Sequence, residues 1–169
     1  MFDDEVSEYT VRKAFPQELP TILSIYEGAR AFMRKNGNPN QWGSDYPPVS
    51  LVKEDVEEGR SMVIVRGVEI CGVFCLFEGD DPTYAVIDDG NWLSDKPYVT
   101  IHRIAGKRGC RGIVKTACDY ARGICGHLRA DTHENNAPMR AALTKYGFRH
   151  CGTIYVREHL PRMAFEFVG

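Results

Sequence analysis

The segment from residue 98 to residue 133 constrains the fold of this chain more than any other. The β-rich run YVTIHRIA (98–105) leads into a short loop, the loop leads into an amphipathic helix, and the run HLRADTH (127–133) is a second strand. Strand, helix and strand form a β-α-β unit, which belongs in a sheet covered by helices. In open sheets of this kind, ligands bind beyond the carboxyl ends of strands, where helices begin.

The loop between the first strand and the helix is basic and rich in glycine. Residues 106–112 hold three glycines together with Lys107, Arg108 and Arg111. The first backbone N–H groups of a helix lack intrahelical partners, so they form a ready site for phosphate. From its residues alone, this loop is either a plain surface turn or the cradle of a phosphorylated cofactor.

The rest of the chain contains no repeat or linker that would divide it. With 169 residues, 43% of them hydrophobic, the chain suits one domain over residues 1–169 with a sizeable core. Asn135 or Asn136 is the expected cap of the last helix, Gly147 its stop, and Ser50 the cap of the second helix. The predicted strands are 9–15, 61–65, 69–79, 98–105, 127–133, 150–156 and 162–168, and the predicted helices are 17–37, 50–59, 111–126 and 134–148.

Charge and cysteine content narrow the functional classes. The net charge is −2, which gives no general reason to expect nucleic acid or an anionic membrane as a partner. No apolar run approaches the ~20 residues of a membrane span, and the acidic start MFDDEVSEYT is unlike a signal peptide. Because no C-x-x-C pair occurs, we interpret the cysteines as reduced thiols of a cytoplasmic protein. They are Cys71, Cys75, Cys110, Cys118, Cys125 and Cys151.

Two motifs resemble those of the GNAT superfamily, the GCN5-related N-acetyltransferases. The first is the hexapeptide GCRGIV that begins at Gly109, which is similar to the family pattern Gln/Arg-x-x-Gly-x-Gly/Ala. Gly112 matches the central glycine, whereas Gly109 and Val114 replace the usual first and last residues. Main-chain amides donate whatever the side chain is, and Arg108 or Arg111 can supply the missing side-chain charge.

The second motif is NAPMRAALTKYGF (136–148), which is similar to the family helix Asn-x-x-Ala-x-x-Leu-Tyr-x-x-x-Gly-Phe. Asn136, Gly147 and Phe148 match this pattern. Leu143 stands where the family often has a tyrosine that protonates the departing thiolate. The resemblance extends over nearly the whole chain in the order of its elements.

The resemblance implies a fold, a cosubstrate and a set of contacts. The fold is α/β, the GNAT fold: a mixed, mostly antiparallel sheet of about six to seven strands with about four helices, splayed between strands 98–105 and 127–133. Acetyl-CoA binds in that splay as cosubstrate, and no metal is implied. The implied pantetheine contacts are Ile104, Ala105 and Gly106, the implied pyrophosphate contacts are Cys110, Arg111, Gly112, Ile113, Val114 and Lys115, and Asn136 also belongs to the coenzyme site.

Amine acetylation needs a group that takes a proton from the amine, and often one that protonates the thiolate. His102 is the candidate base, because it lies on the strand at the splay and histidine titrates near neutral pH. By alternation its side chain is expected on the same face as Thr100 and Ile104. The alternative is a histidine hydrogen-bonded inside the sheet. Tyr146 and Tyr155 are candidate substitutes for the missing acid, or else core aromatics with wet hydroxyls.

The acceptor site is expected under the loop GNPNQWGSDYPP (37–48), which overhangs that region in the family. Trp42 and Tyr46 are candidates for an aromatic wall that binds the substrate. Trp92, with acidic neighbours, and His133, at the end of strand 127–133, are further candidates. The alternative is that the tryptophans anchor loops and that His133 is a solvated strand end.

These inferences lead to one main hypothesis and two alternatives. The main hypothesis is an acetyl-CoA-dependent N-acetyltransferase that acts on a primary amine of a small molecule or peptide by direct attack on the thioester. A non-catalytic module that binds CoA or a related ligand on the same fold is the first alternative, and an enzyme with a cysteine nucleophile is the second. No nucleic-acid or membrane partner is expected, and exposed terminal strands are compatible with a homodimer.

Overall fold

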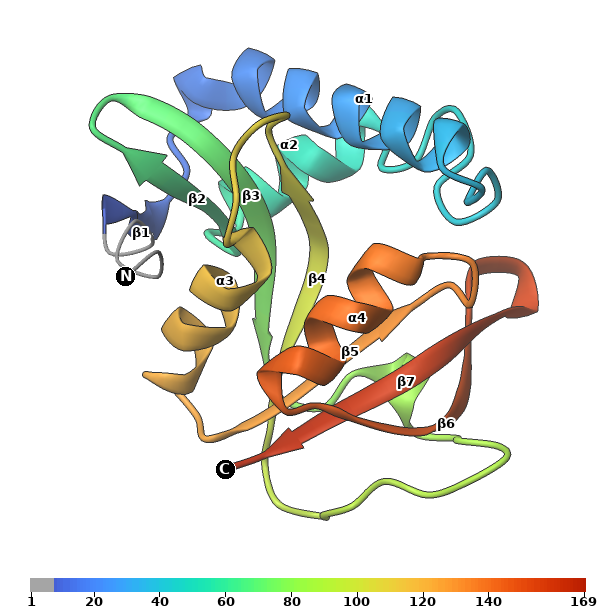
Figure 1. Cartoon of the computed structure of the whole chain (residues 1–169). Helices are drawn as coiled ribbons and strands as arrows, with labels where there is room; N and C mark the ends of the chain where they lie inside the picture. The colour runs from blue at the N-terminus through green and yellow to red at the C-terminus, as the bar shows by residue number, and fades with distance from the viewer. Residues whose placement is uncertain (1–7) are drawn as a thin grey trace.

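Seven strands form one sheet in the order β1-β2-β3-β4-β5-β7-β6 (Figure 1). The computed structural model describes residues 8–169, so the acidic residues at the very start of the chain lie outside it. Every neighbouring pair is antiparallel except β4 and β5. The predicted mixed, mostly antiparallel sheet is therefore confirmed. The strands are β1 (Thr10–Lys13), β2 (Ser61–Arg66), β3 (Glu69–Glu78), β4 (Val99–Gly106), β5 (His127–Thr132), β6 (Arg149–Val156) and β7 (Leu160–Val168).

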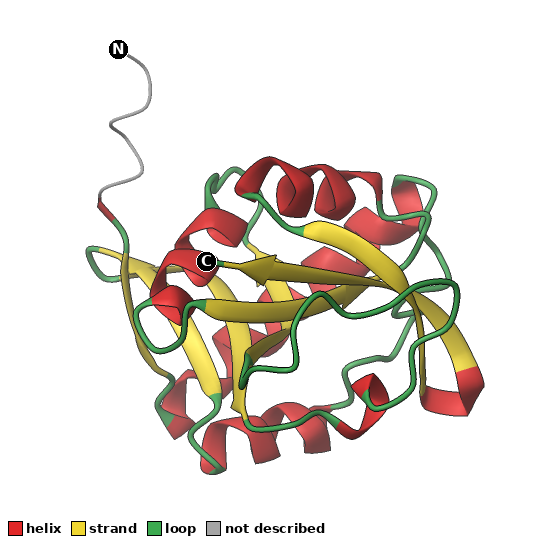
Figure 2. Ribbon diagram, turned by 90° about the horizontal axis from the view of Figure 1, so that it is seen from below, coloured by secondary structure: helices red, strands yellow, loops and turns green. Residues whose placement is uncertain are grey.

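Four α-helices cover both faces of the sheet, as Figure 2 shows. They are α1 (Leu19–Lys35), α2 (Val49–Glu57), α3 (Ile113–Arg122) and α4 (Ala137–Tyr146). The apolar stripes of α1 and α2 pack on one core, which includes Ile22 and Val63. Those of α3 and α4 pack on another, which includes Ala117, Leu143 and Phe74. Residues at helical spacing thus produce the two-sided cover that an amphipathic pattern predicts.

The two parallel strands separate soon after they begin. β4 and β5 are paired only at Val99–Leu128 and Thr100–Arg129, whereas β5 stays paired with β7 as far as Thr132. Figure 1 shows β4 and β5 diverging beyond this point. The predicted splay is confirmed, and it leaves the edge of β4 after Thr100 without a neighbouring strand.

A β-bulge interrupts β4 at the splay. Cys75 of β3 lies opposite His102, but Val73, two residues earlier, lies opposite Ala105, three residues later. The extra residue is accommodated because Arg103 adopts a left-handed conformation with φ of 48°. Tyr26 holds this turn by donating from its hydroxyl to the carbonyl of Arg103 at 2.8 Å.

The bulge overturns one prediction about side-chain direction. Strict alternation would place Ile104 on the same face as His102, but Ile104 packs with Ile101 against the core under α3 and α4. His102 instead lies against the ring of Tyr84, with centroids 5.9 Å apart. The added residue at Arg103 shifts the alternation by one position, so His102 and Ile104 face opposite sides of the sheet.

Most element ends differ from prediction by a few residues, and two of the differences concern helix caps and stops. The cap of α2 is Pro48 in an extended conformation rather than Ser50, because the proline pre-sets the backbone that enters the helix. Helix α3 ends at Arg122, before Ile124, which is 46% exposed. The cap of α4 is confirmed: Asn136 Oδ1 accepts from the N–H of Met139 at 3.2 Å.

Among the described residues, no helix combines the length and the apolar character needed to cross a membrane.

Candidate active site

A cleft with a cavity volume of about 370 Å³ opens where β4 and β5 diverge. Helices α3 and α4 contribute one wall, and the loop over residues 36–48 together with the end of β3 contributes the other. Ile104 and Val114 line the end near α3, while His102 and Asp131 line the cleft from the diverging strands. The splay therefore connects the start of α3 with the opposite face of the sheet.

The basic loop at the start of α3 is open to solvent. Gly109 and Gly112 have φ of 87° and 75°, which is the left-handed region that favours glycine. The first helical amide that bonds back is that of Thr116, to the carbonyl of Gly112 at 2.9 Å. The amides at the start of α3 are thus left without intrahelical acceptors, in the arrangement that binds phosphate.

Helix α3 approaches the sheet closely because two glycines face its first residue. Gly72 and Gly106 are directly opposed on β3 and β4. A Cβ at Gly72 would lie 2.9 Å from Ile113 Cδ1, and a Cβ at Gly106 would lie 3.0 Å from Ile113 Cγ1. The absence of side chains at both positions therefore sets the position of the start of α3 against the end of β4.

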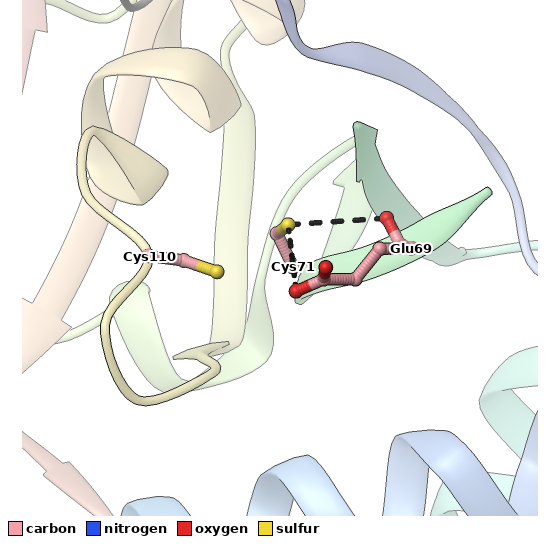
Figure 3. A group of neighbouring side chains, drawn as sticks. All are labelled: Glu69, Cys71 and Cys110. Carbon is pink, nitrogen blue, oxygen red and sulfur yellow. Dashed lines mark hydrogen bonds between the residues drawn. The ribbon is translucent and has the colours of Figure 1, made fainter. Parts of the chain in front are cut away.

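Cys110 of this loop points toward Cys71 and Glu69 of β3 (Figure 3). Their ligand atoms lie within 4.8 Å of one another, and among residues 8–169 no other set of three or more histidine, cysteine or acidic residues is so arranged. The Glu69 carboxylate already has a cation, since Lys107 Nζ lies 3.3 Å from its Oε1. Burial raises the pKa of the Cys71 thiol to about 11. We therefore assign no metal to this group.

The predicted coenzyme residues lie along one continuous path. Ile104, Ala105 and Gly106 form the end of β4 after the bulge, and residues 110–115 form the loop and first turn of α3. Asn136 lines the cleft, but its side chain is already used: Nδ2 donates to Gln41 Oε1 at 2.9 Å while Oδ1 caps α4. The role of each of these residues toward a coenzyme stays a prediction.

His102 is held between two carboxylates in the wall of the cleft. Its Nε2 lies 2.6 Å from Asp81 Oδ2, and its Nδ1 lies 3.7 Å from Asp131 Oδ2. The short contact favours a proton on Nε2, which leaves the Nδ1 lone pair free to accept one. Phe77 and Tyr84 pack on the imidazole ring at centroid distances of 5.4 Å and 5.9 Å. The histidine is therefore both oriented and confined.

Both carboxylates beside His102 are fixed by further hydrogen bonds. Burial alone would raise the pKa of Asp81, but hydrogen bonds from His102 and Thr83 outweigh it and lower that pKa to about 2. Tyr84 donates its buried hydroxyl to Asp131 Oδ2 at 2.6 Å. Asp81 is therefore ionised at neutral pH and can orient the imidazole.

Gln41 fastens the overhanging loop to the rest of the cleft. Its carbonyl accepts from Arg162 Nη2 at 2.9 Å, and its side-chain oxygen accepts from Asn38 and Asn136. The predicted wall residues Trp42 and Tyr46 both line the cleft. The loop thus lies over the cleft, as the family resemblance implies.

Of the predicted catalytic and substrate-binding residues, four are not among those that line the cleft. Tyr146 donates its hydroxyl to Asp119 at 2.6 Å, and burial raises its pKa to about 12. The ring of Tyr155 stacks on that of His159, with centroids 4.3 Å apart. Trp92 donates from Nε1 to the carbonyl of Tyr84, and His133 accepts from the N–H of Asn135. Their catalytic or substrate-binding roles stay predictions that the cleft does not support.

The main residues that sequence reasoning left out of the site are Asp81, Gln41 and Arg162. Asp81 follows the strand over 69–79 in the run EGDD, where an acidic pair at a strand end was a usable signal. Arg162 was less accessible to sequence reasoning, because a charged residue near a predicted strand start reads as exposed. In the structure Arg162 is 4% exposed and lines the cleft.

Solved structures of acetyltransferases share the fold of this chain. No protein-family model matches the sequence, and no curated protein matches it. An acetyltransferase of the GNAT family from Streptococcus agalactiae superposes with a TM-score of 0.87 at 29% identity, covering 95% of each chain. This chain belongs to the GNAT superfamily.

More distant structures share the fold of this GNAT protein. The putative acetyltransferase yncA from Salmonella typhimurium, solved with its cofactor acetyl-CoA, has a TM-score of 0.61 at 12% identity over 95% of this chain and 94% of that one. The aminoglycoside acetyltransferase AAC(6')-Ib, solved with coenzyme A, has a TM-score of 0.63 at 15% identity over the same shares. At these identities, the similarity to the two structures shows a shared fold only.

Proposed function

We propose that this protein transfers the acetyl group of acetyl-CoA to a primary amine of a small molecule or peptide. One observation carries the proposal: a single cleft extends from Ile104 and Val114, beside the unpartnered amides at the start of α3, to the His102–Asp81 pair. The first feature suits a phosphorylated coenzyme, and the second suits removal of a proton from an amine. The acetyl-CoA and CoA that accompany solved structures of the same fold add support.

The coenzyme end of the cleft consists mainly of backbone groups. The start of α3 at Gly112 offers N–H groups to the diphosphate, and Lys107, Arg108 and Arg111 add positive charge to the exposed loop. The unpaired edge of β4 offers its main chain to the pantetheine, since no strand covers it beyond Thr100. Apolar Ile104 and Val114 flank this path.

The other end of the cleft provides the base. The amine nitrogen attacks the carbonyl carbon of the thioester, and the new C–N bond replaces the C–S bond. The amine proton moves to Nδ1 of His102, whose Nε2 proton stays hydrogen-bonded to Asp81. The resulting imidazolium lies between Asp81 and Asp131, so two carboxylates stabilise the charge as it forms.

The departing thiolate does not need a side chain of the protein to protonate it. A thiol has an ordinary pKa of about 8.5, so its thiolate is a far better leaving group than an alkoxide and can take its proton from water. Leu143, at the position where the family often has a tyrosine, is buried and lines the cleft. The proposal therefore assigns no side chain to protonate the thiolate.

Two measurements test the function. Isothermal titration with acetyl-CoA should give saturable binding, and release of free thiol should follow addition of primary amines from a mixed panel of small amines and peptides. Absence of binding at millimolar coenzyme would refute the proposal. Binding without thiol release would favour the non-catalytic coenzyme-binding module, for which the buried Leu143 is the specific supporting feature. The cytoplasmic location and the homodimer remain predictions beside this function.

A further inference from the structure

The cleft contains a buried cation to which the acetyl transfer gives no role. Arg162 on β7 is 4% exposed and lines the cleft. Its guanidinium donates to the carbonyl of Pro161 at 2.8 Å and to that of Gln41 at 2.9 Å. Within residues 8–169, no carboxylate oxygen lies within 4.0 Å of its side-chain nitrogens. A buried charge without a counter-ion is costly, so this guanidinium is suited to an anion that comes from outside the chain.

Other shielded arginines of the described chain do not share this situation. Arg103 pairs with Asp55 through Nε at 2.8 Å and Nη2 at 2.9 Å. Arg129, which is 6% exposed, pairs with Glu166. Burial also lowers the pKa of Arg162, whereas the pKa of Arg103 is raised by its neighbours despite burial. Arg162 therefore differs from these structural arginines in having no carboxylate within 4.0 Å, although the more distant Asp131 partly opposes the lowering of its pKa.

Arg162 and His102 lie at two ends of one polar row. Asp131 of β5 is directly opposite Ala164 of β7, and alternation places Arg162 on the same face as Ala164. Asp131 in turn lies 3.7 Å from His102 Nδ1. A guanidinium, a carboxylate and the candidate base thus follow one another across β7, β5 and β4, on a single wall of the cleft.

The charges along this row suit a molecule with two opposite charges. Arg162 and the exposed cleft residue Arg157, which both donate to the carbonyl of Gln41, contribute positive charge at one end of the row. Asp131 and Asp81 contribute negative charge at the other end, beside His102. Resting on the proposed acetyl transfer, we propose that the acceptor is an amino acid-like molecule whose amine faces His102 and whose carboxylate binds Arg162. The planar guanidinium fork matches a carboxylate in shape as well as charge.

The contact of Arg162 with the overhanging loop does not account for its charge. The carbonyl of Gln41 needs only one N–H donor, which a neutral side chain can supply without the cost of a buried cation. The two carbonyl contacts use Nη1 and Nη2 once each, so a guanidinium with five N–H groups keeps donors for a ligand. The charge is explained by an anionic group of the acceptor.

The first experiment compares each common L-amino acid with its carboxamide as acceptor for the wild-type protein. The amide keeps the amine and the side chain but lacks the carboxylate. We expect kcat/KM for the best amino acid to exceed that of its amide by about 10- to 100-fold, the range for a hydrogen bond to a charged group. Calorimetry of the same pair on CoA-saturated protein measures binding independently of turnover. Equal preference for acid and amide would overturn the carboxylate site and leave acetyl transfer intact.

The second experiment assigns the preference to Arg162. In Arg162→Gln, the ratio between acid and amide should fall to about one, mainly through KM for the acid. Arg162→Lys keeps the charge but loses the fork, and should keep part of the preference. Arg140→Gln removes an exposed arginine of α4 that does not line the cleft, so it should keep the wild-type ratio. The affinity for acetyl-CoA, measured alongside, reports whether each variant is folded.

The outcomes separate this inference from the function on which it rests. If amines without a carboxylate are acetylated as well as amino acids, only the inference fails. A preference for the acid that survives in folded Arg162→Gln also refutes the assignment to Arg162. If no amine is acetylated but amino acids bind more tightly than their amides, the carboxylate site stands without the transferase function. Absence of both turnover and amino-acid binding refutes both.

Discussion

At the scale of single residues, the chemistry of the cleft depends on the environment of one histidine. The position of His102 on a strand predicts a base, but its suitability for that role comes from residues far away in sequence. Asp81 orients the ring through Nε2, and Asp131, fixed by Tyr84, lies beside Nδ1. Because His102 lines the cleft and keeps one nitrogen without a short contact, we propose it as the base rather than as a histidine satisfied inside the sheet.

Replacing this histidine should reduce turnover without affecting coenzyme binding. We expect His102→Gln to lower kcat about 10²- to 10³-fold, the usual contribution of a positioned base. Steady-state thiol release and calorimetry with acetyl-CoA measure the two effects separately. His150→Gln is the matched control, since His150 on β6 binds the carbonyl of Gly152 away from the cleft. A comparable loss in both variants would refute the assignment.

The pair formed by Asp81 and His102 should also stabilise the fold in a pH-dependent manner. Because the pKa of Asp81 is lowered to about 2 in the folded chain, its stabilisation is present above its ordinary pKa and is lost as the pH falls toward 2. The shift from about 3.9 corresponds to about 2.5 kcal/mol of unfolding free energy. The free energies of unfolding of the wild type and of Asp81→Asn, measured in urea, should differ by this amount at pH 6 and converge near pH 2. A constant difference would contradict it.

At the scale of elements, the bulge in β4 is held by a buried ionic group. Asp55 of α2 is 1% exposed, pairs with Arg103 through both oxygens and also accepts from Arg60 Nε at 2.7 Å. It thereby links α2 to the turn that separates the faces of His102 and Ile104. The position of the candidate base on β4 thus depends on a helix more than forty residues earlier in the chain.

Removal of this carboxylate should destabilise the protein strongly. Asp55→Ala leaves two guanidinium groups without their main counter-ion, so we expect a loss of about 3–5 kcal/mol in the free energy of unfolding. Chemical denaturation at pH 7 measures it. Glu57→Ala provides a control on the same helix, since its exposed pair with Lys53 at 3.9 Å should contribute less than about 1 kcal/mol. Similar losses in the two variants would argue against a special role for the buried pair.

The start of α3 offers a second test at this scale. In Gly106→Ala, the new Cβ would lie 3.0 Å from Ile113 Cγ1, so the Ile113 side chain or the helix start must move by a few tenths of an ångström. We expect the affinity for acetyl-CoA to fall, with a loss of stability of about 1–3 kcal/mol. Adding Ile113→Ala removes the clashing atom, and the double variant should bind coenzyme more tightly than Gly106→Ala alone. Additive losses would show that the close approach is not what positions the loop.

At the scale of the whole molecule, the reactivity of the thiols can report where the proposed coenzyme binds. All six cysteines are free, and burial raises the pKa of Cys75 and Cys118 to about 12 and that of Cys71 and Cys151 to about 11. Such thiols are poor nucleophiles at neutral pH, which argues against the alternative of a cysteine enzyme. Cys110 and Cys125 are only partly buried and remain open to alkylation.

Coenzyme should protect one of these two thiols and leave the other unchanged. Cys110 lies in the loop before α3, whereas Cys125 follows the far end of that helix. With saturating acetyl-CoA, we expect the rate of iodoacetamide labelling at Cys110 to fall severalfold while the rate at Cys125 stays the same, as measured by peptide mass spectrometry. Labelling of both at unchanged rates under conditions where calorimetry detects binding would place the coenzyme elsewhere.

Much of this molecule was predictable because its signals are local. The cap at Asn136, the stop at Gly147 and the apolar stripes of the helices depend on residues within a few positions of one another. The family motifs added the splay between β4 and β5, and the left-handed Gly112 before α3 agrees with the glycine that the first motif requires. These features follow from short-range backbone and side-chain preferences.

The residues that give the cleft its character were decided by tertiary structure. Asp81, Asp131 and Arg162 come from three separated segments and line one cleft, because the sheet order places the end of β3 beside β4 and places β5 between β4 and β7. The left-handed turn at Arg103, stabilised by Tyr26 and Asp55, reverses the alternation that the strand pattern predicts. The sequence by itself determined the elements and their order, because these depend on neighbours in the chain. Which charges are paired, and which buried arginine is left for a ligand, depends on contacts that only the folded chain forms.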